Sequence, residues 1–237
     1  MATADLQGLL AFGDSITNGG GELQWGVALQ SWAQWLARSL GLPFTNYAVD
    51  GNRAADVVNR QMPAHNRLNA VGRARYQLGC LYIGVNDVRK PDWDPEAYER
   101  DFALALNYLL ERCERVLTMT IPLDLGRPRA GEKVLQANAI INRQAVRTGA
   151  LVVDLTDFGG REVMMFDHVH PTAMGQIALA ERALATLAGQ GLEARVRPRA
   201  LADPSRGPAA RVRAVLTYAY RSGKQALNLE LRSRLSR

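Results

Sequence analysis

A serine, an aspartate and a histidine stand where together they could perform nucleophilic catalysis. Ser15 follows an apolar segment in the tripeptide Gly13-Asp14-Ser15, and Asp167 precedes His170 by three residues. A serine hydroxyl is a weak nucleophile, so it needs a neighbouring base and a third group that holds the base. An acid three residues before a histidine, in a turn leading into a helix, can place carboxylate and imidazole on the same side. This pattern favours acyl transfer through an acyl-enzyme.

Three histidines are available as the base. We predict His170, because Asp167 would fix its tautomer and leave the other ring nitrogen facing Ser15. His168 is adjacent to the aspartate and would point elsewhere, and His65 lies in a polar stretch that we interpret as a solvated loop. The alternative interpretation is structural: the aspartate caps the following helix, the histidines lie on the surface, and the serine belongs to an ordinary helix-capping turn.

Acyl transfer also requires hydrogen-bond donors aimed at the oxyanion of the tetrahedral intermediate. Asn86 follows an apolar segment and Gly84, and its side-chain amide could be one donor. Gly51 could bring a backbone N–H close to the substrate, since glycine has no Cβ. Alternatively, Asn86 is a turn residue and Gly51 occupies a position that needs a positive φ. No cysteine cluster, phosphate-binding glycine loop or further histidine pair indicates a metal or cofactor, and we expect neither.

Alternating strand-like and helix-like segments would position these residues. Several of the strand-like segments are continuously apolar, which is typical of a parallel sheet covered on both faces. One helix is predicted to begin after Asp94 with Pro95 at its first position, and the last near Pro171 and Thr172. The loops after the strands should carry the chemistry, because the carboxyl ends of parallel strands share one edge. The strand-like segments are Leu6 to Phe12, Phe44 to Val49, Leu78 to Val85, Arg115 to Ile121 and Ala150 to Leu155.

The length and charge distribution predict one catalytic domain and an appendage. The chain has 237 residues, and 47% of them are apolar, which suits a globular protein. Residues 191–237 hold 11 Lys and Arg against 3 Asp and Glu, whereas residues 1–190 hold 18 against 20. The basic excess therefore belongs to the end of the chain. We predict a catalytic domain at 1–190, followed at 191–237 by a Pro/Arg-rich linker and a basic amphipathic helical tail.

The tail could lie on an anionic membrane surface or an acidic partner, or it could fold back on the domain or only solubilise the chain. Its charges are not interleaved with base-stacking aromatics beyond Tyr218 and Tyr220, so we expect no specific nucleic-acid binding. No apolar run is long enough to cross a bilayer, and the N-terminus lacks the features of a signal peptide. Cys80 and Cys113 occur in settings typical of buried thiols. We expect a cytoplasmic protein, peripheral to the membrane if the tail binds lipid; the oligomeric state is not predicted.

Four short blocks, in this order, resemble those of the SGNH hydrolase family, also called the GDSL type. The resemblance extends over residues 6 to 188. Ile16 replaces the leucine of the GDSL name, as in many members. The matching blocks are Gly13-Asp14-Ser15, Asn46 to Gly51, Gly84 to Asp87, and Asp167 to Pro171.

The resemblance implies a three-layer α/β/α sandwich of flavodoxin-like type with a five-stranded parallel sheet. It implies a Ser15, His170 and Asp167 triad, with an oxyanion hole made by the backbone N–H groups of Ser15 and Gly51 and the side chain of Asn86. Members cleave short-chain esters, lipid esters, acyl thioesters and acetylated sugars, so a small-molecule acyl ester is the expected substrate. An acyltransferase or a non-catalytic binding domain of the same fold would show the same blocks.

Overall fold

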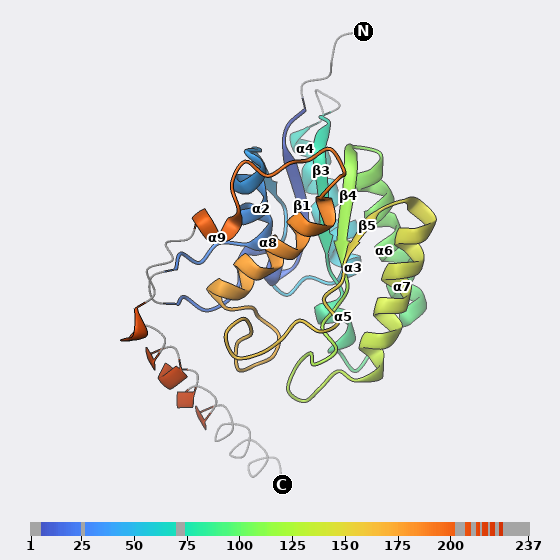
Figure 1. Ribbon diagram of the computed structural model, residues 1–237. Coiled ribbons are helices and arrows are strands. Elements are labelled where there is room, and N and C mark those ends of the chain that lie inside the picture. The colour runs from blue at the N-terminus through green and yellow to red at the C-terminus, as the bar shows by residue number, and fades with distance from the viewer. Residues whose placement is uncertain are drawn as a thin grey trace.

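Five parallel strands form one sheet in the order β2-β1-β3-β4-β5 (Figure 1). The computed structural model describes residues 6–24, 27–69, 74–201, 207–209, 212–213, 215–217, 219–220 and 223–224. This strand order is that of flavodoxin-like sheets. The predicted α/β class with a five-stranded parallel sheet is therefore confirmed. The strands are β1 (Leu9–Gly13), β2 (Phe44–Asn46), β3 (Tyr76–Tyr82), β4 (Cys113–Met119) and β5 (Leu151–Val153).

Helices cover both faces of this sheet and complete the three layers. Figure 1 shows α2 and α8 on one side of the strands and α6 and α7 on the other. Among the described residues the helices are α1 (Ser15–Asn18), α2 (Trp32–Leu40), α3 (Ala54–Asp56), the π-helix η1 (Val57–Gln61), α4 (Met62–Leu68), α5 (Val85–Val88), α6 (Pro95–Leu110), α7 (Glu132–Thr148), α8 (Ala173–Leu187) and α9 (Pro198–Leu201).

The central strand β1 is apolar along its whole length because both of its faces are buried. All five residues of β1 are buried, with no alternation between an inner and an outer face. The edge strands β2 and β5 have only three residues each, shorter than the segments predicted for them. Cys80 and Cys113 are buried and free, as predicted.

The two helices that were predicted from capping residues begin where expected. The Asp94 side chain accepts hydrogen bonds from the backbone N–H groups of Glu96 and Ala97, and Pro95 is the first residue of α6. Thr172 caps α8 through its side chain, which accepts from the Gly175 N–H. A side-chain oxygen that satisfies the free N–H groups of a first helical turn explains both starts.

His65 is a correction to the sequence analysis, because it is a buried residue of α4 and not part of a solvated loop. Its side chain is 2% exposed. Its Nδ1 lies 2.7 Å from the Tyr108 hydroxyl and its Nε2 lies 3.1 Å from the Tyr76 hydroxyl. The polar residues around it in sequence, including Asn66 and Arg67, are exposed on the outer side of the helix. The partners that satisfy the imidazole come from distant elements, so the local sequence looked merely polar.

The chain after α8 returns to the domain. The N–H groups of Arg195 and Val196 both donate to the Ser39 carbonyl, and the Arg199 N–H donates to the Glu181 carboxylate at 3.0 Å. Part of the segment interpreted as a linker thus contacts α2 and α8, while the division at residue 190 stays a prediction. The described residues of the tail include no helix long and apolar enough to span a membrane. Residues 225–237, the end of the predicted amphipathic tail, lie outside the described residues, so membrane binding also stays a prediction.

Candidate functional site

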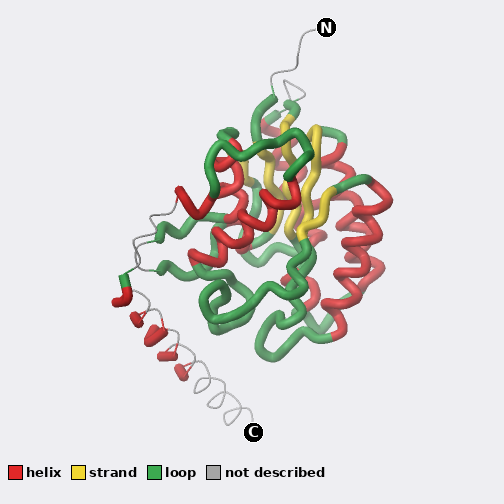
Figure 2. The backbone as a smooth tube through the Cα atoms, in the orientation of Figure 1, coloured by secondary structure: helices red, strands yellow, loops and turns green. Residues whose placement is uncertain are grey.

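The loops that follow the strands gather at one end of the molecule (Figure 2). Ser15 lies there, at the sharp turn between β1 and α1. The turn requires Gly13, because a Cβ at that position would lie 2.5 Å from the Tyr82 carbonyl oxygen. The buried Asp14 caps α1 by accepting a hydrogen bond from the Ile16 N–H at 2.9 Å. Ser15 is therefore the first residue of a capped helix, directly beyond a buried strand.

The structure brings Ser15, His170 and Asp167 into one chain of hydrogen bonds. Ser15 Oγ lies 3.0 Å from His170 Nε2, and His170 Nδ1 lies 2.7 Å from Asp167 Oδ2. The second carboxylate oxygen accepts the backbone N–H groups of Val169 and His170 at 2.9 and 3.1 Å. An ionised carboxylate can only accept, so the imidazole donates from Nδ1 and its Nε2 is free to accept from the serine. These contacts fix both the orientation and the tautomer of the ring.

The aspartate also changes the proton affinity of the imidazole. The hydrogen bond that His170 donates to Asp167 raises the pKa of His170 above its ordinary value, although partial burial opposes this rise. Burial alone would raise the pKa of Asp167, but the hydrogen bonds from the ring and from the two backbone N–H groups lower it overall. The pair therefore favours a charged carboxylate beside an imidazole that readily accepts a proton.

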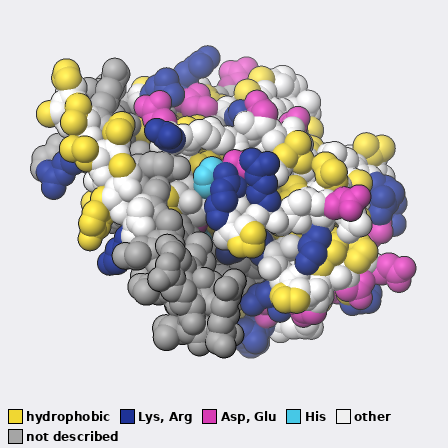
Figure 3. Space-filling model, turned by 90° about the horizontal axis from the view of Figure 1, so that it is seen from below, with side chains coloured by type: hydrophobic (Ala, Val, Ile, Leu, Met, Phe, Trp, Pro, Cys, Tyr) yellow, Lys and Arg dark blue, Asp and Glu magenta, His cyan; other side chains and the backbone are white. Residues whose placement is uncertain are grey.

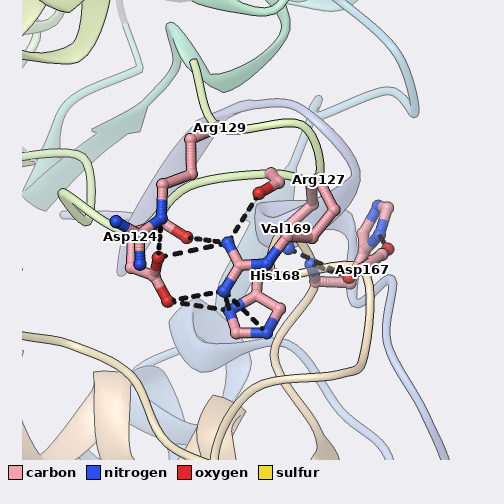
Figure 4. A network of polar contacts seen from close by, with 8 residues as sticks. Asp124, Arg127, Arg129, Asp167, His168 and Val169 are labelled. Carbon is pink, nitrogen blue, oxygen red and sulfur yellow. Dashed lines mark hydrogen bonds and ion pairs between the residues drawn. The ribbon is translucent and has the colours of Figure 1, made fainter. Parts of the chain in front are cut away.

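His168 faces away from this chain and belongs to a separate polar network (Figure 4). Its backbone has a φ of 54°, which is rare outside glycine. Arg127 Nη2 lies 2.9 Å from His168 Nδ1, and Asp124 Oδ2 lies 3.0 Å from the same nitrogen. The Gly126 N–H donates to the His168 carbonyl at 2.8 Å. These contacts hold the loop after β4 against the loop that carries His170.

The segments after β2 and β3 bring in Gly51, in a loop, and Asn86, in α5. Gly51 has a φ of 77°, in the region that favours glycine. The Asn86 side-chain amide donates one hydrogen bond to the Asn52 carbonyl at 3.0 Å. The neighbouring Asp87 carboxylate accepts the N–H of Ala54. The two segments are thereby joined to each other.

Three side-chain amides on helices, which the sequence analysis did not single out, hold backbone segments around the site. Gln61 accepts from the Gly13 N–H at 3.1 Å and donates to the Gly13 carbonyl at 2.7 Å. Asn138 makes the same pair of bonds with Ile121, after β4. Gln176 accepts from the Trp32 N–H and donates to two carbonyls of the Ser15 loop. Because each amide both donates and accepts, it can satisfy a peptide that has left the sheet. The only trace of such residues in the sequence is an Asn or Gln at a helix position where the apolar pattern predicts a buried side chain.

Two buried carboxyls lie close to the nucleophile turn. Burial raises the pKa of Asp14 to about 7 and that of Asp87 to about 6, although backbone N–H groups donate to both. One oxygen of Asp14 has no hydrogen-bond partner. Within the described part of the chain, no group of three or more His, Cys, Asp and Glu side chains is arranged to hold a metal ion.

Known structures share this architecture. Axe2, an acetylxylan esterase from Geobacillus stearothermophilus, superposes with a TM-score of 0.58 at 20% identity, over 76% of this chain and 93% of that one. LAE5, an alpha/beta hydrolase enzyme from the metagenome of Lake Arreo, Spain, gives a TM-score of 0.58 at 20% identity, over 76% and 94% of the two chains. TesA gives 0.59 at 22% identity, over 76% and 97%. Identities this low show a shared fold.

The sequence itself shows the family. No curated protein matches the chain. Residues 11–177, however, match the model of the GDSL-like Lipase/Acylhydrolase family. The match covers well over half of the chain, from the strand before Ser15 into the helix after His170. The chain therefore belongs to the GDSL-like lipase/acylhydrolase family.

Proposed function

We propose that the protein hydrolyses a carboxylic ester or thioester through an acyl-enzyme on Ser15. The observation that carries this proposal is the unbroken chain of hydrogen bonds from Ser15 through His170 to Asp167. A serine hydroxyl gains nucleophilic power when an oriented base accepts its proton. The family and the fold of Axe2 are consistent with ester hydrolysis. Catalytic mutants of Axe2 replace a serine in one case and an aspartate in another.

In the proposed first half-reaction, Ser15 Oγ attacks the acyl carbonyl carbon while His170 Nε2 takes the hydroxyl proton. The carbonyl oxygen becomes an oxyanion, and Asp167 stabilises the imidazolium by accepting its Nδ1 proton in a hydrogen bond. The bond to the leaving oxygen or sulfur then breaks. His170 gives its proton to the leaving group, and the acyl group stays on the serine.

The second half-reaction replaces the alcohol or thiol with water. His170 removes one proton from water as the water oxygen attacks the acyl carbon, and it returns that proton to Ser15 Oγ when the acid leaves. The same ring nitrogen therefore serves both steps. A raised pKa makes the imidazole of His170 a stronger base. The ring must be neutral to accept the proton, so the reaction requires a pH above this raised pKa.

The oxyanion would be bound by the N–H groups of Ser15 and Gly51 and by the Asn86 side chain. Within the described part of the chain, neither backbone N–H donates to another group. The Asn86 amide has two N–H groups and uses one of them on Asn52, so the other remains for a substrate. Donors held in place before the reaction lower its barrier, because nothing has to reorganise as charge develops.

A fluorophosphonate probe and an ester panel together test the proposal. We expect the probe to label Ser15 in the native protein and not in Ser15→Ala, and only the native protein to hydrolyse short acyl esters. Circular dichroism and thermal unfolding of Ser15→Ala control for folding. Hydrolysis that survives in Ser15→Ala would refute the assignment. Added acceptor alcohols distinguish an acyltransferase, which would form the new ester faster than the free acid.

A further inference from the structure

Three arginines lie along the rim of the site, beside the loop that carries His170. Arg127 and Arg129 belong to the loop after β4, and Arg89 directly follows α5. We call them the rim arginines. Asp124 is the carboxylate paired with two of them, at 2.9 Å from Arg127 Nη2 and 2.7 Å from Arg129 Nε. One carboxylate neutralises one of three guanidinium charges, so the rim keeps a positive excess.

Arg89 is the rim arginine whose charge is not compensated. It is exposed, and no acidic side chain among the described residues forms an ion pair with it. Its Nε would lie 3.8 Å from a Cβ placed on Gly126. Gly126 is the residue whose N–H holds the His168 carbonyl. The Arg89 guanidinium therefore extends from the Asn86 side of the site toward the loop of His170.

Other acidic side chains at this end of the molecule have partners other than Arg89. Asp92 is 3.1 Å from Arg53, Asp167 is bonded to His170, and the buried Asp87 accepts from a backbone N–H. The charge of Arg89 also reaches His170, where it opposes the net rise of the imidazole pKa. Figure 3 views the end of the molecule where the loops gather, with Lys, Arg and acidic side chains around a partly exposed histidine. Arg89 thus adds a positive charge beside the catalytic histidine of the proposed reaction.

We propose that Arg89 is a specificity-determining residue that binds an anionic oxygen group, a carboxylate or a phosphate, on the alcohol portion of the ester. This inference rests on the proposed function. His170 must protonate the leaving oxygen, so the alcohol has to lie over the loop of His170, where the rim arginines are. A guanidinium suits such a group, because its planar donors match the oxygens of a carboxylate or phosphate.

The test compares matched substrates in native protein, Arg89→Gln and Arg89→Lys. The acetyl ester of 4-hydroxybenzoate carries a carboxylate on its alcohol portion, and the acetyl ester of 4-hydroxybenzamide is its neutral counterpart. The acetyl ester of 4-hydroxyphenyl phosphate separates phosphate from carboxylate. The monoester 4-nitrophenyl succinate, set against 4-nitrophenyl butyrate, places the charge on the acyl portion. Arg147→Gln is the matched control, because this exposed arginine lies in the last turn of α7, just before the start of β5 and away from the strand ends that carry the site.

We expect the ratio of kcat/KM for the anionic ester to that for its neutral counterpart to fall roughly 5- to 10-fold in Arg89→Gln, the size of a charge pair near a protein surface. Arg89→Lys should retain part of the ratio, Arg147→Gln should retain all of it, and added salt should weaken it in native protein. Calorimetry in a Ser15→Ala background should show the same loss in binding of the anionic ester when Arg89 is replaced.

Three results would overturn the inference. An unchanged ratio in Arg89→Gln would exclude charge recognition by this residue, and an equal loss for both esters would make its role structural. A preference confined to the succinate ester would place the charge on the acyl portion. These results leave hydrolysis of the neutral esters by native protein intact and so do not touch the proposed function. Hydrolysis of no ester, with Ser15 unlabelled by the probe, would refute both.

Discussion

The Asn86 side chain and the Asn52 carbonyl are joined by a hydrogen bond of 3.0 Å, which fixes the amide before any substrate arrives. We expect Asn86→Ala to lower kcat by roughly 10²- to 10³-fold, the usual cost of losing one oxyanion donor. The measurement is steady-state hydrolysis of a short ester, with thermal unfolding as a control because the tie to Asn52 is also lost. An effect confined to KM would show that Asn86 binds the ground state instead.

The two neighbouring histidines should differ sharply in their effect on the reaction. His170→Ala is expected to lower kcat by about 10⁴-fold or more, since a triad loses most of its advantage with any one member. His168→Asn should change kcat less than His170→Ala, because that ring faces Arg127 and Asp124. Asparagine is chosen since it tolerates the positive φ found there. A larger loss from the His168 variant would mean that the base is misassigned.

The pH dependence of the rate should report the contact between Asp167 and His170. This contact raises the pKa of His170, and the base must be neutral, so kcat/KM should rise as pH increases through a pKa above the ordinary 6.5. In Asp167→Asn the rising limb should move to lower pH, and kcat should fall roughly 10⁴-fold because the wrong tautomer is favoured. NMR titration of the imidazole in Ser15→Ala, with and without the second change, provides an independent reading. A pH–rate profile whose rising limb does not move in Asp167→Asn would contradict the assigned contact between Asp167 and His170.

The buried imidazole of His65 should make part of the stability depend on pH. Burial lowers its pKa, and the charge of Arg112 lowers it further. Below about pH 6.5 the unfolded chain then binds more protons than the folded one, so this contribution falls as pH decreases through 6.5 toward the lowered folded pKa. His65→Phe should cost about 1–3 kcal/mol near pH 8, since the Tyr76 hydroxyl loses its partner, and the deficit should shrink near pH 5.

Urea unfolding of native and variant protein at both pH values measures that difference. The titration of Asp14 and Asp87 is common to the two proteins and cancels when they are compared. The double variant His65→Phe, Tyr76→Phe should recover part of the loss, because no hydroxyl is then left unpaired. A deficit that stays constant with pH would show that the imidazole titrates alike in both states.

Local patterns were sufficient for the framework of the fold. Uninterrupted apolar runs predicted the parallel strands, and Asp94 and Thr172 predicted two helix starts, because strands buried on both faces and helix caps both depend on near neighbours. The spacing of Asp167 and His170 predicted their contact for the same reason. Their arrangement against Ser15 followed from the order of the blocks and from the shared edge of the strands.

The remaining features depend on partners far apart in sequence. The sequence around His65 predicts a solvated side chain, because its partners Tyr76 and Tyr108 are far away along the chain. The hydrogen bonds of Gln61 to Gly13 likewise join a helix to a strand, and the rim arginines come from two separate segments. No periodicity of the sequence predicts contacts between segments so far apart. The catalytic roles themselves remain the proposal that the mutants are designed to test.

The π-helix η1 allows one continuous helical segment to serve two separate partners. Ala54 lies before η1 and donates its N–H to Asp87, whereas Gln61 ends η1 and bonds to Gly13, beside the nucleophile. An α-helix turns about 100° for each residue, and a π-turn holds one residue more than an α-turn. Deleting a single residue within Val57–Gln61 would therefore rotate everything on one side of the deletion by roughly that angle. The segment could then keep Gln61 on the nucleophile strand or the Ala54 N–H on Asp87, but not both.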